Sequence, residues 1–423
     1  MPVSTFKLEY IAIVNDKIDS SPNLSQIENQ ASFYFIDSLA FVTASKIFKR
    51  RLQLEVFKKA SRPFNLEQEQ GIRAYLIFNA ENKKQHYLLL VVHHIIADGT
   101  SFNVFSKELS HLYNAYTKNL IPTLSPLTIQ YKDYSRWQRA ISPTVITEQL
   151  QFWKKQLHKA PSFLQLPTDK PRPATNSFQG GNVYLTIPVA TSKALKILAE
   201  KNNATLYMVL LGIFQVLLCR YTQQTDMLIG SPVANRHKTE FKNLMGFFVN
   251  TVVIRAQISE QPLTFVDCLA QVRQTVLDAL ANQTVPFEQV VQALNSTHNL
   301  NENPLVQVMF VLQNYSRQTI DLHNLDVTLE MDSPMAKFDL TLECIEKKGA
   351  IDCHFEYATD LFERNTILQM ANNFLALAKN IALLPTSDIH TISFLSPQEV
   401  ALQKSWQGLK SFYPKKTGHS TAI

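Results

Sequence analysis

The most constraining feature of this sequence is an apolar run that ends in two histidines and then changes its period. Residues 86–92 are almost continuously apolar and rich in strand-forming side chains, which predicts a buried strand. After Gly99, large apolar side chains recur at alternating spacings of three and four up to Tyr116, the period of an amphipathic helix. The residues between, 93–99 (His-His-Ile-Ile-Ala-Asp-Gly), therefore lie on a turn from a strand into a helix.

This turn carries side chains suited to proton transfer. An imidazole with an ordinary pKa of about 6.5 accepts protons near neutral pH, and a strand end holds it firmly, so His94 is the candidate base. Asp98 is expected to brace the turn through a cation or backbone donors. Gly99 permits close approach of the backbone, and amides at a helix start favour the negative charge of an oxyanion. A base beside oxyanion donors indicates acyl transfer.

Other interpretations of the two histidines remain open at this point. A single histidine at a strand end is more often a core residue with its hydrogen bonds satisfied. Adjacent strand residues point to opposite faces, so at most one of His93 and His94 faces a given cleft. The same geometry argues against zinc, and no Cys-x-x-Cys pair occurs among the four cysteines, so no metal is expected. The cysteines are Cys219, Cys268, Cys344 and Cys353.

The His-His-x-x-x-Asp-Gly pattern resembles the signature of the chloramphenicol acetyltransferase-like superfamily. Six further segments are each similar to a motif of nonribosomal peptide synthetase condensation domains. They are 131–138 (YKDYSRWQ), 166–173 (LPTDKPRP), 230–236 (GSPVANR), 245–251 (MGFFVNT), 285–288 (VPFE) and 357–362 (YATDLF). Because these segments span most of the chain, the joint resemblance is much more specific than the histidine motif alone.

The resemblance implies an α/β fold of two chloramphenicol acetyltransferase-like lobes, forming a V-shaped pseudo-dimer with mixed sheets and a central channel. It divides the chain into an N-terminal lobe at 1–165, an inter-lobe linker at 166–176 and a C-terminal lobe at 177–395. The segment 396–423 resembles the lead-in to an adenylation domain. The first helix and first strand of the family's N-terminal lobe are expected to be missing, because residues 1–14 resemble sequence that follows them.

The activity implied by the resemblance is peptide bond formation. In this family an acceptor amine attacks a donor thioester, and both substrates are carried on the 4′-phosphopantetheine arms of peptidyl carrier proteins. Upstream and downstream carrier proteins and an adjacent adenylation domain are the implied partners, and no cofactor is bound directly. A stand-alone acyltransferase of the superfamily and a catalytically inactive carrier-docking domain are the alternatives. Epimerisation is disfavoured because residues 246–249 are Gly-Phe-Phe-Val rather than the usual Gly-Trp-Phe-Thr. Heterocyclisation is disfavoured because paired aspartates would replace the two histidines.

Roles for single residues also follow from the resemblance. His94 is implied as the catalytic or substrate-orienting base, with Gly99 at the same site, and His93 and Asp98 support it. Arg236 is expected to pair with Asp98 across the lobe interface. Three residues are candidates for lining the channel, namely Phe248, Asn250 and Asn303.

The composition fits a chain with large buried cores. It is 45% hydrophobic and 18% charged, and its length of 423 residues is too great for one ordinary core and indicates two domains or lobes. The apolar run 206–219 is too short to cross a membrane and predicts a buried helix capped by Thr205. No nucleic-acid or membrane partner is expected, although a basic surface could steer an acidic carrier protein, since the net charge is +6. Unpatterned cysteines and the absence of an export signal favour a cytoplasmic location.

Two of the cysteines are predicted to face each other. If Lys348-Gly349 forms a two-residue hairpin loop, Cys344 and Cys353 become a directly opposite pair that is not joined by ladder hydrogen bonds, with Cα atoms about 4.5 Å apart. Free thiols are expected at both positions.

Overall fold

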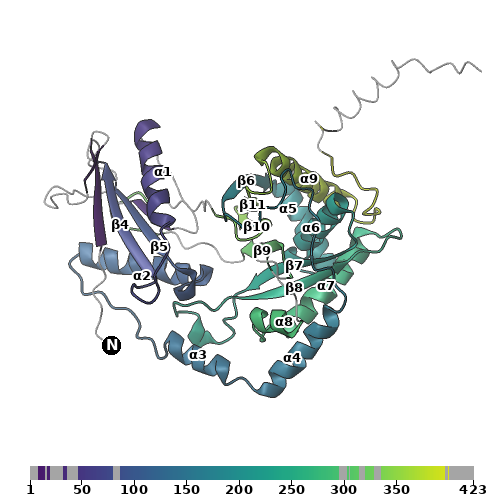
Figure 1. Ribbon diagram of the computed structural model, residues 1–423, viewed down its shortest axis with the longest axis horizontal. Coiled ribbons are helices and arrows are strands. Elements are labelled where there is room, and N and C mark those ends of the chain that lie inside the picture. The colour runs from purple at the N-terminus through teal and green to yellow at the C-terminus, as the bar shows by residue number, and fades with distance from the viewer. Residues whose placement is uncertain are drawn as a thin grey trace, which may run out of the picture.

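The computed structural model describes residues 8–14, 17–19, 32–35, 46–79, 86–294, 303, 305–313, 320–327, 335–395 and 399. They form two α/β lobes that spread apart from a common base (Figure 1). The base contains α3 (Tyr131–Arg139) and α4 (Pro143–Gln156). The predicted α/β class with mixed sheets is confirmed. Residues 1–7 and, apart from 399, the predicted lead-in segment at 396–423 lie outside the described residues.

The N-terminal lobe contains a five-stranded mixed sheet with the strand order β2-β1-β4-β5-β3. Its strands are β1 (Leu8–Val14), β2 (Lys17–Asp19), β3 (Ser32–Phe35), β4 (Ile72–Asn79) and β5 (His86–Val92), and its helices are α1 (Lys46–Ala60) and α2 (Gly99–Thr117). β1 runs parallel to β4, whereas β4 and β5 are antiparallel. The predicted strand at 86–92 is confirmed as β5, and its nearly continuous apolar sequence matches the burial of consecutive residues, which point to opposite faces of the sheet.

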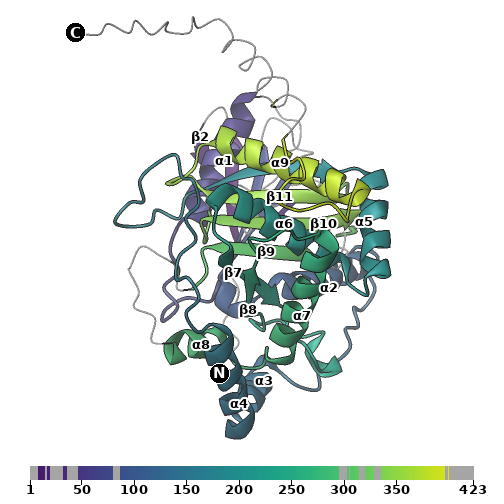
Figure 2. The same ribbon diagram turned by 90° about the vertical axis from the view of Figure 1, so that its right-hand side faces the viewer.

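The C-terminal lobe contains a six-stranded mixed sheet with the strand order β6-β11-β10-β9-β7-β8. Its strands are β6 (Gly180–Ile187), β7 (Asp226–Val233), β8 (Asn250–Gln257), β9 (Val308–Gln313), β10 (Leu340–Lys347) and β11 (Ala350–Ala358). Its helices are α5 (Val189–Lys201), α6 (Leu206–Thr222), α7 (Phe265–Ala281), α8 (Phe287–Ala293) and α9 (Arg364–Leu383). Figures 1 and 2 show α5, α6 and α9 on one face of this sheet.

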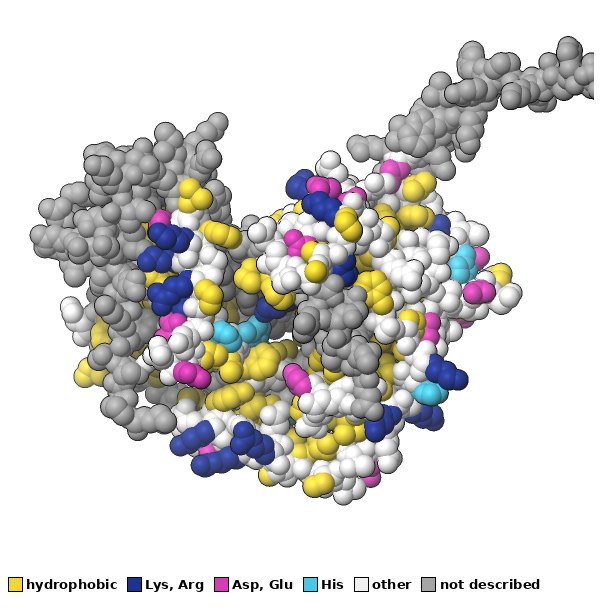
Figure 3. All heavy atoms as spheres, viewed as in Figure 1, with side chains coloured by type: hydrophobic (Ala, Val, Ile, Leu, Met, Phe, Trp, Pro, Cys, Tyr) yellow, Lys and Arg dark blue, Asp and Glu magenta, His cyan; other side chains and the backbone are white. Residues whose placement is uncertain are grey.

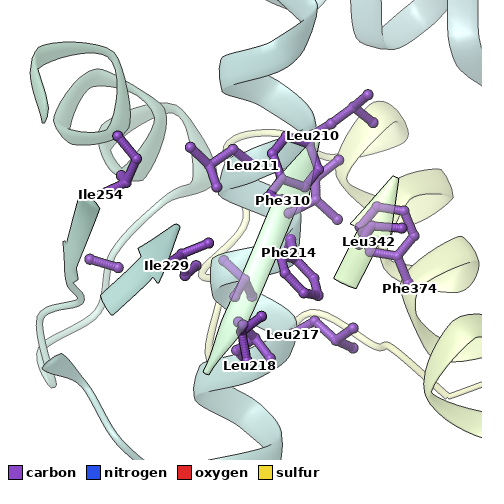
Figure 4. Close-up of a cluster of buried hydrophobic side chains, with 14 of the residues drawn as sticks. Leu210, Leu211, Phe214, Leu217, Leu218, Ile229, Ile254, Phe310, Leu342 and Phe374 are labelled. Atoms are coloured by element: carbon purple, nitrogen blue, oxygen red, sulfur yellow. The ribbon is translucent and has the colours of Figure 1, made fainter. Parts of the chain in front are cut away.

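Helix α6 is the centre of the larger core, as the apolar run predicted. Every residue from Met208 to Cys219 is buried. The hydroxyl of Thr205 accepts a hydrogen bond from the Met208 amide at 3.3 Å, which confirms the predicted cap. Figure 4 shows Phe214 of α6 among side chains from the sheet and from α9. Burying one such side chain contributes about 1.5–3 kcal/mol, so the core alone gives this lobe a strong driving force for folding.

The described residues contain no single helix long and apolar enough to cross a membrane. Helices α5 and α6 meet the length and composition criteria only as a pair, and the pair is bent by 106°.

Helix α4 joins the second lobe even though it precedes residue 165. Trp153 of α4 is 3% exposed and belongs to the large core. Its indole nitrogen donates to the Asn282 carbonyl at 2.9 Å, and Gln149 accepts from the Thr284 amide at 3.0 Å. The chain therefore passes from the first lobe into the second before it reaches the proline-rich segment at 166–173.

The predicted cysteine pair is present at the β10–β11 hairpin. Cys344 is directly opposite Cys353 in the antiparallel register, and their sulfur atoms lie 3.8 Å apart as free thiols. The two loop residues, Lys348 and Gly349, have φ angles of 51° and 83°. Positive φ at both positions is the geometry that two-residue hairpin loops favour, because it matches the twist of the strands. Burial raises the pKa of the Cys344 thiol well above its usual value.

Replacing the loop glycine is expected to weaken this hairpin. Gly349→Ala places a side chain at a φ of 83°, which costs about 1–2 kcal/mol. Lys348→Asn is the matched control, because asparagine tolerates the left-handed region, and it is expected to be neutral or slightly stabilising. Chemical denaturation of both variants checks this; equal stabilities would contradict it.

Candidate active site

The histidine turn begins where β5 ends. It forms the short 3-10 helix η2 (His94–Ile96), which His93 caps. The Nδ1 atom of His93 accepts a hydrogen bond from the Ile95 amide at 3.1 Å, and the His93 amide donates to the Gly71 carbonyl at 2.7 Å. The His93 ring meets Phe64 edge-on at 5.6 Å. His93 therefore holds the shape of the turn.

His94 is half-buried and is oriented by packing. Its ring meets the Phe247 ring edge-on, with centroids 5.1 Å apart. Its Nδ1 atom is buried and has no hydrogen-bond partner among the described residues. No carboxylate of the described residues therefore orients this imidazole through a hydrogen bond to Nδ1.

Asp98 ends the turn and begins α2. It is 7% exposed and caps the helix by accepting the Ser101 amide at 2.8 Å. Its other carboxylate oxygen accepts the Phe248 amide, which comes from the second lobe, at 3.1 Å. Arg236 donates to Asp98 at 2.9 Å, and each side chain of this ion pair is only 4% exposed. The predicted pairing of Asp98 with Arg236 is confirmed.

Arg236 also organises the segment that follows it. One guanidinium nitrogen donates to the carbonyls of Phe241 and Leu244, at 2.6 and 2.7 Å. The guanidinium lies over the Phe248 ring at 3.9 Å from its centroid. A single side chain thus fixes the segment 236–248 of the second lobe against the histidine turn of the first.

Three residues to which the sequence analysis gave no individual role complete this junction. The Ser101 hydroxyl is buried and lies 2.9 Å from the carbonyl and 3.0 Å from the amide of Gly246. A Cβ atom at Gly246 would collide with the Tyr131 ring, so this position requires glycine. The Tyr131 hydroxyl donates to the Phe247 carbonyl at 2.7 Å.

An aromatic cluster lies beneath the ion pair. We call Tyr131, Tyr134, Trp137, Phe241, Leu244 and Phe248 the junction cluster. Burial raises the pKa of Tyr134 to about 12, so its hydroxyl keeps its proton. That hydroxyl accepts from the Asn235 amide at 3.0 Å.

The three channel-lining candidates each make contacts within the protein. Phe248 is 1% exposed inside the junction cluster, so the expectation that it lines an open passage is wrong. The Asn250 amide donates to the carbonyls of Gln283 and Val285, at 2.8 and 2.9 Å, which holds the loop before α8. Asn303 donates to the Lys337 carbonyl at 2.7 Å. Phe247 is 37% exposed and contacts His94, so it is the phenylalanine that borders the site.

The fold and site together define a two-lobed α/β domain whose histidine turn is braced by a buried ion pair. The chain belongs to the condensation domain family, whose model matches residues 29–403. The predicted family is thereby confirmed.

Curated relatives include much longer proteins that are named as synthases and synthetases. The chain is 38% identical over 366 residues to malpibaldin synthetase of Mortierella alpina, covering 86% of this chain and 7% of that protein. It is 36% identical over 364 residues to bacitracin synthase 3 of Bacillus licheniformis, covering 85% of this chain and 6% of that protein. The chain therefore spans a small fraction of the relatives it matches.

Solved structures share the fold at low sequence identity. The X-domain from teicoplanin biosynthesis matches with a TM-score of 0.74 and 23% identity, covering 89% of this chain and 82% of that one. The first condensation domain of the CDA synthetase matches with a TM-score of 0.68 and 15% identity, covering 88% and 79%. Both likenesses support the two-lobed architecture.

Removing Arg236 is expected to destabilise the protein strongly. Arg236→Ala leaves the buried Asp98 carboxylate without a cation, which costs about 3–5 kcal/mol. Chemical denaturation of the full chain measures this change. The matched control is Arg62→Ala, because Arg62 is 58% exposed in its pair with Glu69 and such pairs contribute at most about 1 kcal/mol. Similar losses in both variants would show that the buried pair has no special role.

Proposed function

We propose that this chain joins a donor acyl or peptidyl thioester to an acceptor aminoacyl thioester by a peptide bond. Each substrate is carried on the 4′-phosphopantetheine arm of a carrier protein, and a channel between the lobes admits both arms. The observation that carries this proposal is the ion pair between Asp98 and Arg236, which holds the turn that bears His94. The names of the relatives, malpibaldin synthetase and bacitracin synthase 3 among them, support a synthetic reaction of this class.

The proposed reaction needs a proton acceptor beside the attacking amine. An α-amino group has a pKa of about 7.7–8.0, and its attack on the thioester carbonyl gives a tetrahedral intermediate with a positively charged nitrogen. In the proposal, Nε2 of His94 takes the proton that this nitrogen loses. The carbon–sulfur bond then breaks, and the donor arm leaves as a thiolate that takes up a proton. The product stays on the acceptor arm through its own thioester.

The start of α2 is the proposed site for the developing oxyanion. Gly99 is exposed and is the first residue of this 19-residue helix. Amides in the first turn of a helix carry partial positive charge and favour anions. His94 and Gly99 lie on the same turn, so one substrate could contact both. His93, Asp98 and Arg236 would support this site without touching the reacting atoms.

The wider setting of the reaction is also proposed. We place upstream and downstream carrier proteins and an adjacent adenylation domain beside this chain in a longer cytoplasmic assembly. The rate would come largely from holding two tethered substrates together, since proximity supplies up to about 7–11 kcal/mol in favourable cases.

His94→Ala is expected to lower the rate of product formation by a factor of about 10²–10⁴, the usual contribution of a positioned acid or base. Mass spectrometry of both loaded carriers measures donor-to-acceptor transfer. His111→Ala is the matched control, because His111 is exposed on α2 and away from the turn, and it should retain full activity. Near-normal product from His94→Ala would reject the base role. Carrier binding without product from the unchanged chain would favour an inactive docking domain.

A further inference from the structure

A cationic strip lies at the base of the two lobes. It consists of Lys132, Arg136 and Arg139 on α3 and of Lys238 and Lys242, which flank the 3-10 helix η3 (Thr239–Phe241). All five side chains are exposed. Figure 3 shows Lys and Arg side chains gathered over α3 at the base of the molecule. The segments 131–139 and 237–245 contain only two carboxylates, Asp133 and Glu240, so the strip is strongly positive.

One of these two carboxylates, that of Asp133, is hydrogen-bonded within its own helix. Asp133 accepts from the Gln130 amide at 2.9 Å as part of the cap of α3. It lies 3.9 Å from Arg136, whose side chain is 79% exposed. Lys238 lies over the Trp137 ring at 4.8 Å from its centroid. The strip therefore keeps most of its charge available to a partner, since the contacts within it neutralise little.

The strip is fixed rigidly to the histidine turn. Tyr131, the first residue of α3, donates to the Phe247 carbonyl, and the ring of Phe247 contacts His94. Arg236 holds the carbonyls of Phe241 and Leu244, which lie in the segment that bears the two lysines. Two exposed apolar side chains, those of Met245 and Phe247, follow the lysines along that same segment and lead to the contact with His94.

We infer that the cationic strip docks one of the two carrier proteins and binds the phosphate of its arm. This inference rests on the proposed function and assigns a partner to this surface. A phosphopantetheine arm has its anionic phosphate at the carrier end and its thioester at the far end, with a largely uncharged segment between. The molecule presents the same order, with cations at α3 and η3, then apolar side chains at 245 and 247, then the imidazole of His94. Charge complementarity of this kind mainly increases the rate of encounter and sets orientation.

The strip lies on one side of the junction, so it should serve one carrier and not both. Its charges are exposed, and salt screens such charges over about 10 Å at 0.1 M ionic strength. Docking should therefore weaken steeply as salt concentration rises. Turnover of a small thioester that has neither phosphate nor protein should be insensitive to the strip, because such a substrate does not reach it.

The double variant Lys132→Glu/Arg136→Glu tests the inference. We expect the KM for one loaded carrier to rise about tenfold or more, with kcat unchanged and with little change for the other carrier. The matched control is Lys154→Glu/Lys155→Glu on α4, which makes the same change of net charge at exposed positions of another helix. The control should leave both KM values unchanged. A truncated thioester should react at the same rate with all three proteins.

Three outcomes would overturn the inference. The first is an unchanged KM for both carriers in the strip variant, and the second is an equal rise for both. The third is that a DNA duplex binds to the strip as tightly as a carrier protein does, because the strip would then bind anions without selectivity. Direct binding of a labelled carrier, measured by fluorescence anisotropy, separates docking from chemistry. Lack of product with intact, strip-dependent binding would reject the proposed reaction and keep the docking site.

Discussion

The buried ion pair between Asp98 and Arg236 is the interaction on which the geometry of the site depends. Removing two charges from water is costly, and their attraction offsets that cost only when the remaining donors and acceptors are also satisfied. Asp98 meets this condition through the amides of Ser101 and Phe248, and Arg236 meets it in part, through the carbonyls of Phe241 and Leu244, because its buried Nε has no partner among the described residues. These partners come from both lobes. The pair is therefore stable in one relative position of the lobes, and this position sets where His94 stands against Phe247.

The contacts around the pair make that position hard to adjust. The backbone at Gly246 lies against the Tyr131 ring so closely that a side chain cannot be accommodated. The Ser101 hydroxyl bonds both the amide and the carbonyl of the same glycine. Close packing of this kind transmits small displacements instead of absorbing them. A change in the junction cluster would therefore reach the imidazole through the backbone of residues 246–248.

Local sequence patterns predicted individual strands, helices and hairpins well. They did not predict contacts between residues that lie far apart in the sequence. The buried strand β5, the core helix α6 and the Cys344–Cys353 register each depend on local periodicity or on the turn that joins two strands. The pairing of Asp98 with Arg236 was predicted only through the family resemblance, since 138 positions separate the two residues. Ser101 and Gly246 carry no sequence signal for their contact. Phe248 was misplaced because residues 245–249 form neither helix nor strand, so no period tells which of two adjacent phenylalanines faces the site.

The absence of a described partner at Nδ1 of His94 bears on how the proposed reaction would be driven. In a nucleophile–base–carboxylate arrangement, the carboxylate orients the imidazole and stabilises its charged form. Here the capped turn at His93 and the contact with the Phe247 ring orient the imidazole, and no anion among the described residues forms a hydrogen bond with Nδ1. A modest base suffices when the proton comes from the positively charged nitrogen of a tetrahedral intermediate, because that nitrogen gives up its proton readily. The rate then depends less on the strength of the base than on the position of the imidazole relative to the two substrates. Accurate placement needs a rigid junction between the two lobes, because in the proposal each lobe holds one tethered substrate. The buried ion pair and the junction cluster supply that rigid junction.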